Sequence, residues 1–116
     1  MSLFVAHHAH PPDSCPVAGD GGAALLAHIS AANAARYGVA IRAEALLDDE
    51  HRLLFVLEAA DRAAVERFLA FLLPLGDLQV LPASSAEQAV GRGGCATGKE
   101  VVRGAGLPPR PADGSG

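Results

Sequence analysis

The hydrophobic and polar positions along the chain change period several times, and these changes predict its secondary structure. Residues 3–10, LFVAHHAH, begin with β-forming residues and end at a double proline, which a strand interior does not tolerate. We therefore expect a first strand over these residues. Apolar residues then recur at helical spacing from a cap at Asp20 to about Tyr37, and Gly38 is placed to end that helix.

Two further apolar segments predict a β-hairpin. Residues 39–48, VAIRAEALLD, alternate, which places Val39, Ile41, Ala43 and Ala45 on one face and Arg42 with Glu44 on the other. The acidic turn DDEH separates them from residues 52–59, RLLFVLEA, whose nearly continuous apolar run is typical of a central strand.

The remaining pattern predicts a helix, a strand and a short last helix. Asp61 is placed to cap a second helix that ends near Pro74, and residues 77–83, DLQVLPA, follow as a fourth strand. Ser84 and Glu87 have capping-box spacing. From Gly91 onward glycine and proline dominate without an apolar period, so we expect one domain over residues 1–93 and a disordered tail over 94–116.

The resulting order, βαββαβ, predicts an α+β ferredoxin-like fold. Right-handed crossovers give a four-stranded antiparallel sheet of order 4-1-3-2 with both helices on one face. The other face is then open, and we expect apolar Phe4, Leu54 and Val56 on it to require cover.

By the order and lengths of these elements, residues 3–83 resemble the dimeric α+β barrel superfamily, in which two such sheets close face to face. The resemblance implies a homodimer. The superfamily includes cofactor-independent oxygenases, haem-handling enzymes and small proteins of unknown function, some of them metal-binding, so the resemblance by itself selects none of these functions.

Composition excludes several classes of partner. The net charge of −4 over 116 residues lacks the basic surplus that binding to nucleic acid or to an anionic membrane requires. No apolar run reaches the roughly 18–20 residues of a membrane span, and MSLFVAHH lacks the features of a secretory signal, so we expect a soluble, cytoplasmic protein. Two cysteines, Cys15 and Cys95, do not make a disulfide framework.

Metal-ligating residue types are concentrated in HHAHPPDSCP, residues 7–16. Because strand side chains alternate, His8 and His10 share one face, close enough to converge on one ion, and His7 faces the other way. Cys15 follows a double proline and can return over the strand end as a third ligand. Two imidazoles and a thiolate would suit one ion of zinc, copper, nickel or iron(II).

The predicted topology adds a fourth candidate ligand. The end of the first strand neighbours the start of the third strand, so His51 and the acidic turn Asp48–Glu50 are expected at the same edge as His8 and His10. His7 would act in support, or as a substitute if the strand register differs by one residue. We therefore predict a metal-binding protein with a site formed by His8, His10, Cys15, His51 and His7.

Other interpretations remain open. The histidines could form a solvated strand end, Cys15-Pro16 resembles the haem-regulatory motif, and a nearby histidine could activate Cys15 as a reactive thiol. An enzyme of the barrel type would place a pocket for a small apolar substrate on the open face, and an interaction protein would have no site of its own. His28 is expected to be structural, and Glu44 or Glu58 to pair with Arg42.

Overall fold

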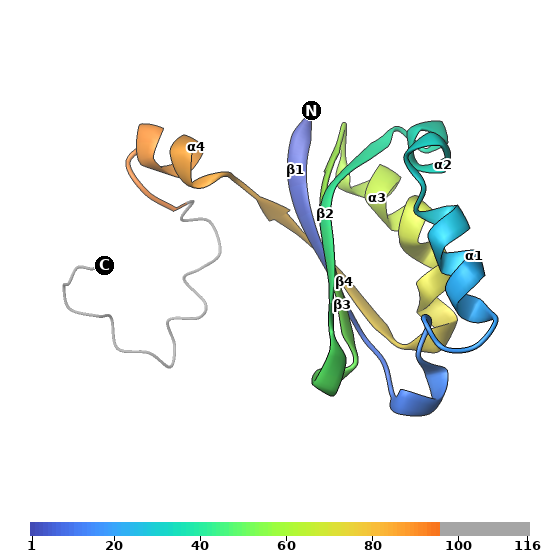
Figure 1. Cartoon of the computed structure of the whole chain (residues 1–116). Helices are drawn as coiled ribbons and strands as arrows, with labels where there is room; N and C mark the ends of the chain where they lie inside the picture. Colours follow the sequence, from blue (N-terminus) through green and yellow to red (C-terminus); the bar gives the residue numbers. More distant parts are fainter. Residues whose placement is uncertain (96–116) are drawn as a thin grey trace. The chain divides into compact units, whose positions relative to one another are not determined.

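The computed structural model describes residues 1–95, and residues Met1–Ser84 form a compact α+β unit. Its helices lie together on one side of a four-stranded sheet (Figure 1). The strands are β1 (Ser2–Ala9), β2 (Val39–Leu47), β3 (Arg52–Ala59) and β4 (Asp77–Ala83). The helices of this unit are α1 (Gly21–His28), α2 (Ala31–Arg36) and α3 (Arg62–Leu69), with 3-10 turns η1 (Pro12–Ser14), η2 (Asp48–Glu50) and η3 (Ala70–Leu75).

The sheet is antiparallel at every pairing, and its strand order is β2-β3-β1-β4. Read from the opposite edge, this order is 4-1-3-2. Strand β1 is central, and its residue Ala9 lies opposite both Arg52 of β3 and Asp77 of β4. The C-terminal end of β1 therefore lies beside the starts of the two strands that flank it.

The expected single helix from Asp20 to Tyr37 is wrong, because the segment forms two helices. Helix α1 ends at His28, and the Ser30 side chain accepts a hydrogen bond from the backbone N–H of Asn33 to cap α2. Serine at this position competes for backbone groups and so favours a helix start over a helix interior. In contrast, the expected cap of α3 is present, since Asp61 accepts from Ala64 N–H at 2.9 Å.

The hydrophobic core lies between the sheet and the helices. Alternate residues of β1 and β3 are buried in it, among them Phe55 and Leu57, and α3 contributes Phe68 and Leu69. The expectation that Phe4 lies on the open face is wrong. Phe4 is 6% exposed and belongs to this core, while Leu54 and Val56 lie half-buried on the face away from the helices.

A β-bulge in β2 changes which residues of this strand face the helices, so the expected alternation is wrong. The register with β3 shifts between Ile41 and Ala43, so that Ile41 shares the helix side with Val39 but Ala43 does not. The expected face of Val39, Ile41, Ala43 and Ala45 is thus divided between two sides of the sheet. The expected ion pair is confirmed at this bulge, with Arg42 Nη2 and Glu58 Oε1 3.0 Å apart.

A second unit begins at Ser85 and includes helix α4 (Ala86–Gly91). A capping box starts this helix, as expected, but one residue later than the sequence pattern indicated. The capping box is formed by Ser85 and Gln88 and not by the expected pair, Ser84 and Glu87. Ser85 Oγ accepts a hydrogen bond from the backbone N–H of Gln88, and Gln88 Oε1 accepts one from the backbone N–H of Ser85. The tail expected over residues 94–116 falls almost entirely outside the described residues. Within residues 1–95, no helix has the length and apolar character of a membrane span.

Candidate metal centre

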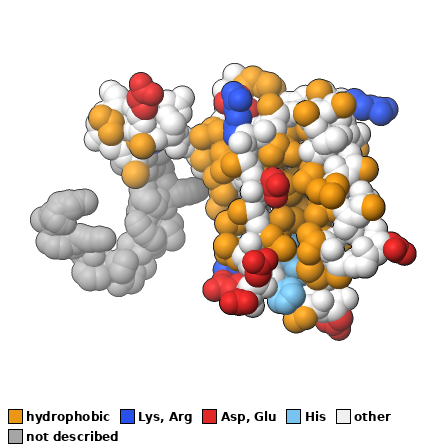
Figure 2. Space-filling model, viewed as in Figure 1, with side chains coloured by type: hydrophobic (Ala, Val, Ile, Leu, Met, Phe, Trp, Pro, Cys, Tyr) orange, Lys and Arg blue, Asp and Glu red, His pale blue; other side chains and the backbone are white. Residues whose placement is uncertain are grey.

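The candidate site lies where β1 ends beside the hairpin that joins β2 to β3. His10 follows the last residue of β1, and its backbone N–H donates to the backbone oxygen of His51 at 3.1 Å. This bond extends the β1–β3 ladder by one residue and fixes the two backbones side by side. The expectation that His51 lies at the same edge as His10 is confirmed. Histidine atoms reach the surface beside acidic side chains at this end of the molecule (Figure 2).

The backbone of His51 adopts a conformation that L-residues rarely take. It follows the 3-10 turn η2 with φ 52° and ψ 54°, and it is the one non-glycine residue of positive φ in residues 1–95. This left-handed conformation costs about 1–2 kcal/mol for a residue with a Cβ, and glycine avoids most of that cost. Such conformations cluster at functional sites, so this one makes His51 a candidate functional residue.

The loop after β1 returns Cys15 toward these two histidines. Ser14 N–H donates to Pro11 O at 2.9 Å and Cys15 N–H to Pro12 O at 3.4 Å, which closes the tight turn η1. The ligand atoms of His10, Cys15 and His51 all lie within 4.8 Å of one another. His10 is buried, and Cys15 and His51 are half-buried. These three residues could hold a metal ion.

His8 is fully buried next to the cluster, and its two ring nitrogens both have partners. Nε2 lies 2.9 Å from the backbone oxygen of Leu72 in η3, and Nδ1 lies 3.3 Å from Nδ1 of His10. A carbonyl oxygen only accepts, so Nε2 of His8 must carry the proton that is shared with Leu72. In a neutral His8 ring, Nδ1 is therefore an acceptor.

This chain of bonds determines which nitrogen of His10 is free. Nδ1 of His10 must donate to Nδ1 of His8, so in a neutral ring Nε2 of His10 carries a lone pair and no proton. That Nε2 atom is buried and has no hydrogen-bond partner in the described structure. An unsatisfied buried polar atom costs roughly 1–3 kcal/mol. A metal ion bound to the lone pair would remove this cost.

The pKa values of both buried rings are lowered, which favours their neutral forms. Burial lowers the pKa of His8, although the bond to Leu72 and the charge of Asp77 act in the opposite direction. Burial also lowers the pKa of His10, and the neighbouring His8 and His51 lower it further. Neutral imidazole is the form that binds a metal ion.

The geometry is close to that of a metal site. The rings of His8 and His10 stack with centroids 5.3 Å apart, and His51 meets His10 edge-on at 5.5 Å. With bonds of about 2.0–2.3 Å, the ligand atoms of a tetrahedral zinc site lie roughly 3.3–3.7 Å apart. Side-chain rotations that draw the three atoms together by about 1 Å would bring all of them within bonding distance of one ion.

Gly76 allows the chain after η3 to cross close to the end of β1. A Cβ atom at this position would overlap the backbone oxygen of Ala9 and crowd the Cα atom of His10. Its φ of 169° is ordinary extended backbone, so the requirement for glycine here is steric. The crossing holds η3, with the Leu72 oxygen, against the site.

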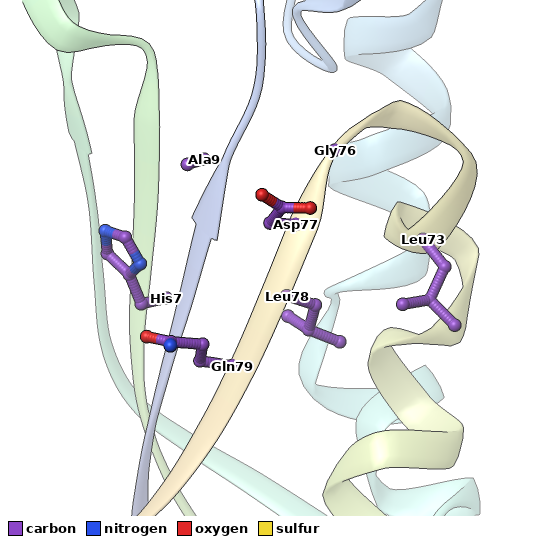
Figure 3. Close-up of a pocket in the computed structure, with 7 residues that line it drawn as sticks. All are labelled: His7, Ala9, Leu73, Gly76, Asp77, Leu78 and Gln79. Atoms are coloured by element: carbon purple, nitrogen blue, oxygen red, sulfur yellow. The ribbon is translucent and has the colours of Figure 1, made fainter.

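His7 and His8 lie outside the cluster that His10, Cys15 and His51 form. His7 projects from the sheet on the side away from the helices, near Gln79, and lines a separate hollow that extends past Asp77 (Figure 3). Alternation along β1 predicted this separation of His7 from its neighbours. The bond from His8 to Leu72 had no sequence signal, since 64 residues separate the two.

His28 is structural, as expected. Its Nε2 donates to the backbone oxygen of Phe68 at 2.7 Å, and its ring packs on Phe68 and Phe71 with centroids 5.0 and 4.1 Å away. The acidic turn Asp48–Glu50 precedes His51, but its carboxylates are not part of the cluster.

No known family model, curated protein or solved structure matches this chain.

Proposed function

We propose that this protein binds one transition-metal ion through His10 Nε2, Cys15 Sγ and one imidazole nitrogen of His51. Two observations on His10 carry the proposal: one of its ring nitrogens lies within 4.8 Å of ligand atoms of Cys15 and His51, and its Nε2 is buried without a hydrogen-bond partner. His8 acts as a positioning residue, because it accepts the Nδ1–H of His10 and is itself held by Leu72. Partners of this kind orient metal-binding histidines in many sites.

The donor set favours zinc among the candidate metals. Two imidazole nitrogens and one thiolate are typical of zinc, and three protein ligands leave a fourth position for solvent or a substrate. A copper site of the blue type commonly adds a weak axial methionine to the same three ligands. The chain has one methionine, Met1, which is 80% exposed and precedes β1, whereas the site follows it.

A titration of the metal-free full chain with Zn²⁺ against a chromophoric chelator tests the proposal. We expect one equivalent to bind. Removing one ligand, in His10→Ala or Cys15→Ser, is expected to weaken binding roughly 100-fold, since the 10–16 kcal/mol of a four-ligand zinc site is shared among its ligands. His7→Ala, on the opposite face, is the matched control and should bind as the parent does. Unchanged binding by Cys15→Ser would overturn the assignment.

The same geometry supports a second candidate function for the metal-free chain. A ring nitrogen of His10 lies within 4.8 Å of Cys15 Sγ. If a side-chain rotation brought the unpartnered Nε2 within hydrogen-bond distance of the sulfur, it could accept the thiol proton and make Cys15 a nucleophile. Reaction with iodoacetamide distinguishes the two functions. Rapid alkylation that depends on His10 and persists with saturating Zn²⁺ would favour the thiol.

Two expectations from the sequence remain predictions. We propose a ferredoxin-like classification on the basis of the strand order and of the two crossovers through helices. We also propose a homodimer, since half-buried Leu54 and Val56 lie on the face that the helices leave open. Sedimentation equilibrium would test the dimer, and a monomer at high concentration would contradict it.

A further inference from the structure

A groove adjoins the candidate metal centre on the side of Cys15. It has a volume of about 340 Å³ and is formed by the loop after β1, the start of α1 and the end of η3. Its lining is mainly apolar and includes Leu25, Phe71 and Leu75. The volume falls at the lower end of the range for small-molecule sites, roughly 300–1,000 Å³.

Cys15 belongs both to the groove and to the group of metal ligands. A metal ion bound to its sulfur would lie about 2.3 Å from that atom, and therefore at the border of the groove. His10 and His51 do not line the groove, so they approach the ion from other sides. This arrangement is compatible with a fourth coordination position that opens toward the groove.

The charge of the bound ion and of the groove lining restricts the charge that a ligand can carry. A divalent ion with one thiolate and two neutral imidazoles keeps a single net positive charge, which one anionic donor would neutralise. None of the residues that line the groove is lysine or arginine, and one, Asp13, is acidic. An anion would therefore be attracted by the metal alone, and Asp13 would disfavour a ligand with a second negative charge.

We propose that the groove binds a small apolar molecule with one anionic metal-binding group, such as a monocarboxylate, which occupies the fourth position of the metal. This inference rests on the proposed metal site and adds its ligand class. The anionic group coordinates the ion beside Cys15, and the apolar part lies against Leu25, Phe71 and Leu75. Each buried methylene of the ligand tightens binding by up to about fourfold.

The test is a titration of the cobalt(II)-loaded full chain with acetate, butyrate and hexanoate, followed by the visible d–d absorption. We expect all three to perturb the bands, and hexanoate to bind at least tenfold more tightly than acetate. In Ala24→Trp an indole fills the groove, and we expect the ratio of the hexanoate affinity to the acetate affinity to fall toward one. Ala24 is exposed on α1, so the substitution does not disturb the core.

Ala23→Trp is the matched control, since Ala23 is also exposed on α1 but does not line the groove. It should keep the preference for hexanoate. If Ala24→Trp does not fold, Ala18→Trp fills the same groove from the loop. Equal affinities for acetate and hexanoate, or a preference that survives both groove variants, would overturn the inference and leave the metal site intact. Failure to bind cobalt at all would overturn the proposed function, and the inference with it.

Discussion

At the scale of single residues, the burial of two histidines determines the chemistry of the site. His8 is 0% exposed and His10 is 6% exposed, and burial lowers the pKa of both rings, which favours their neutral forms. The backbone oxygen of Leu72 selects the tautomer of His8, and His8 in turn selects that of His10. The free lone pair on Nε2 of His10 is the result of these two hydrogen bonds.

Substitution of His8 is expected to weaken metal binding without changing its stoichiometry. His8→Phe removes the acceptor for His10 Nδ1–H, and the loss of such a partner typically weakens binding 10–100-fold. In His8→Asn the side-chain oxygen takes a position close to that of Nδ1 and should restore part of the affinity. Chelator competition measures all three proteins, with circular dichroism as the check on folding. A loss of the bound equivalent in His8→Asn would instead make His8 a ligand.

The three residues of the cluster were all among the five that the sequence predicted. Residue type and strand alternation were sufficient to predict His10 as a candidate ligand. The predicted strand order was needed to place His51 at the same edge of the sheet. The role of His8 could not be predicted, because it depends on a carbonyl 64 residues away. The sequence does not distinguish the carbonyl of Leu72 from the other backbone carbonyls of the chain.

At the scale of elements, two tight turns and one strand end present the three candidate ligands. The hairpin turn η2 presents His51 in a left-handed conformation, and η1 returns Cys15 toward the end of β1. The sequence predicted most elements but not where they break. The cap at Ser30 that divides the first helix is a local hydrogen bond, which apolar periodicity does not report. The register shift between Ile41 and Ala43 likewise interrupts the alternation from which the faces of β2 were predicted.

Two substitutions at His51 separate the cost of its backbone conformation from its role as a ligand. His51→Gly and His51→Ala both remove the imidazole, so we expect both to weaken zinc binding to the same extent. Glycine adopts a φ of 52° without the Cβ penalty, so metal-free His51→Gly should be more stable than His51→Ala by about 1 kcal/mol. Urea unfolding measures this difference. Equal stabilities would show that the turn relaxes in the alanine variant.

Gly76→Ala tests the close crossing of η3 over the end of β1. The added methyl group meets the backbone of Ala9 and His10, which cannot rotate away, so we expect a loss of about 1–3 kcal/mol in the free energy of unfolding. Zinc affinity should fall as well, because His10 is displaced. Gly91→Ala, where a methyl group would meet no atom within 4 Å, is the control and should be nearly neutral. A Gly76→Ala variant with parental stability would contradict the steric account.

At the scale of the whole molecule, the site joins segments that are distant in the chain. His10, Cys15 and His51 come from the end of β1, the loop after it and the β2–β3 hairpin, and η3 supports them through Leu72. A metal ion bound only in the native state would therefore stabilise the fold, by about 2.7 kcal/mol at 100 times the dissociation constant.

The metal-free molecule is expected to lose stability in mild acid. Because the pKa values of His8 and His10 are lowered in the folded state, the unfolded chain binds more protons once the pH falls below about 6.5. This contribution to stability is constant above that pH and decreases as the pH falls toward the lowered values. Urea unfolding between pH 8 and pH 5 measures the decline, and His8→Phe/His10→Phe should show a shallower one. Identical declines in the two proteins would exclude these histidines as its source.

In the proposed site, two imidazoles and the thiolate of Cys15 hold one ion. X-ray absorption spectroscopy at the zinc edge of the loaded full chain measures these ligands. We expect one sulfur scatterer at about 2.3 Å and two imidazole nitrogens at about 2.0–2.1 Å, with the sulfur lost in Cys15→Ser. A first shell of nitrogen and oxygen alone in the parent protein would contradict the proposed site.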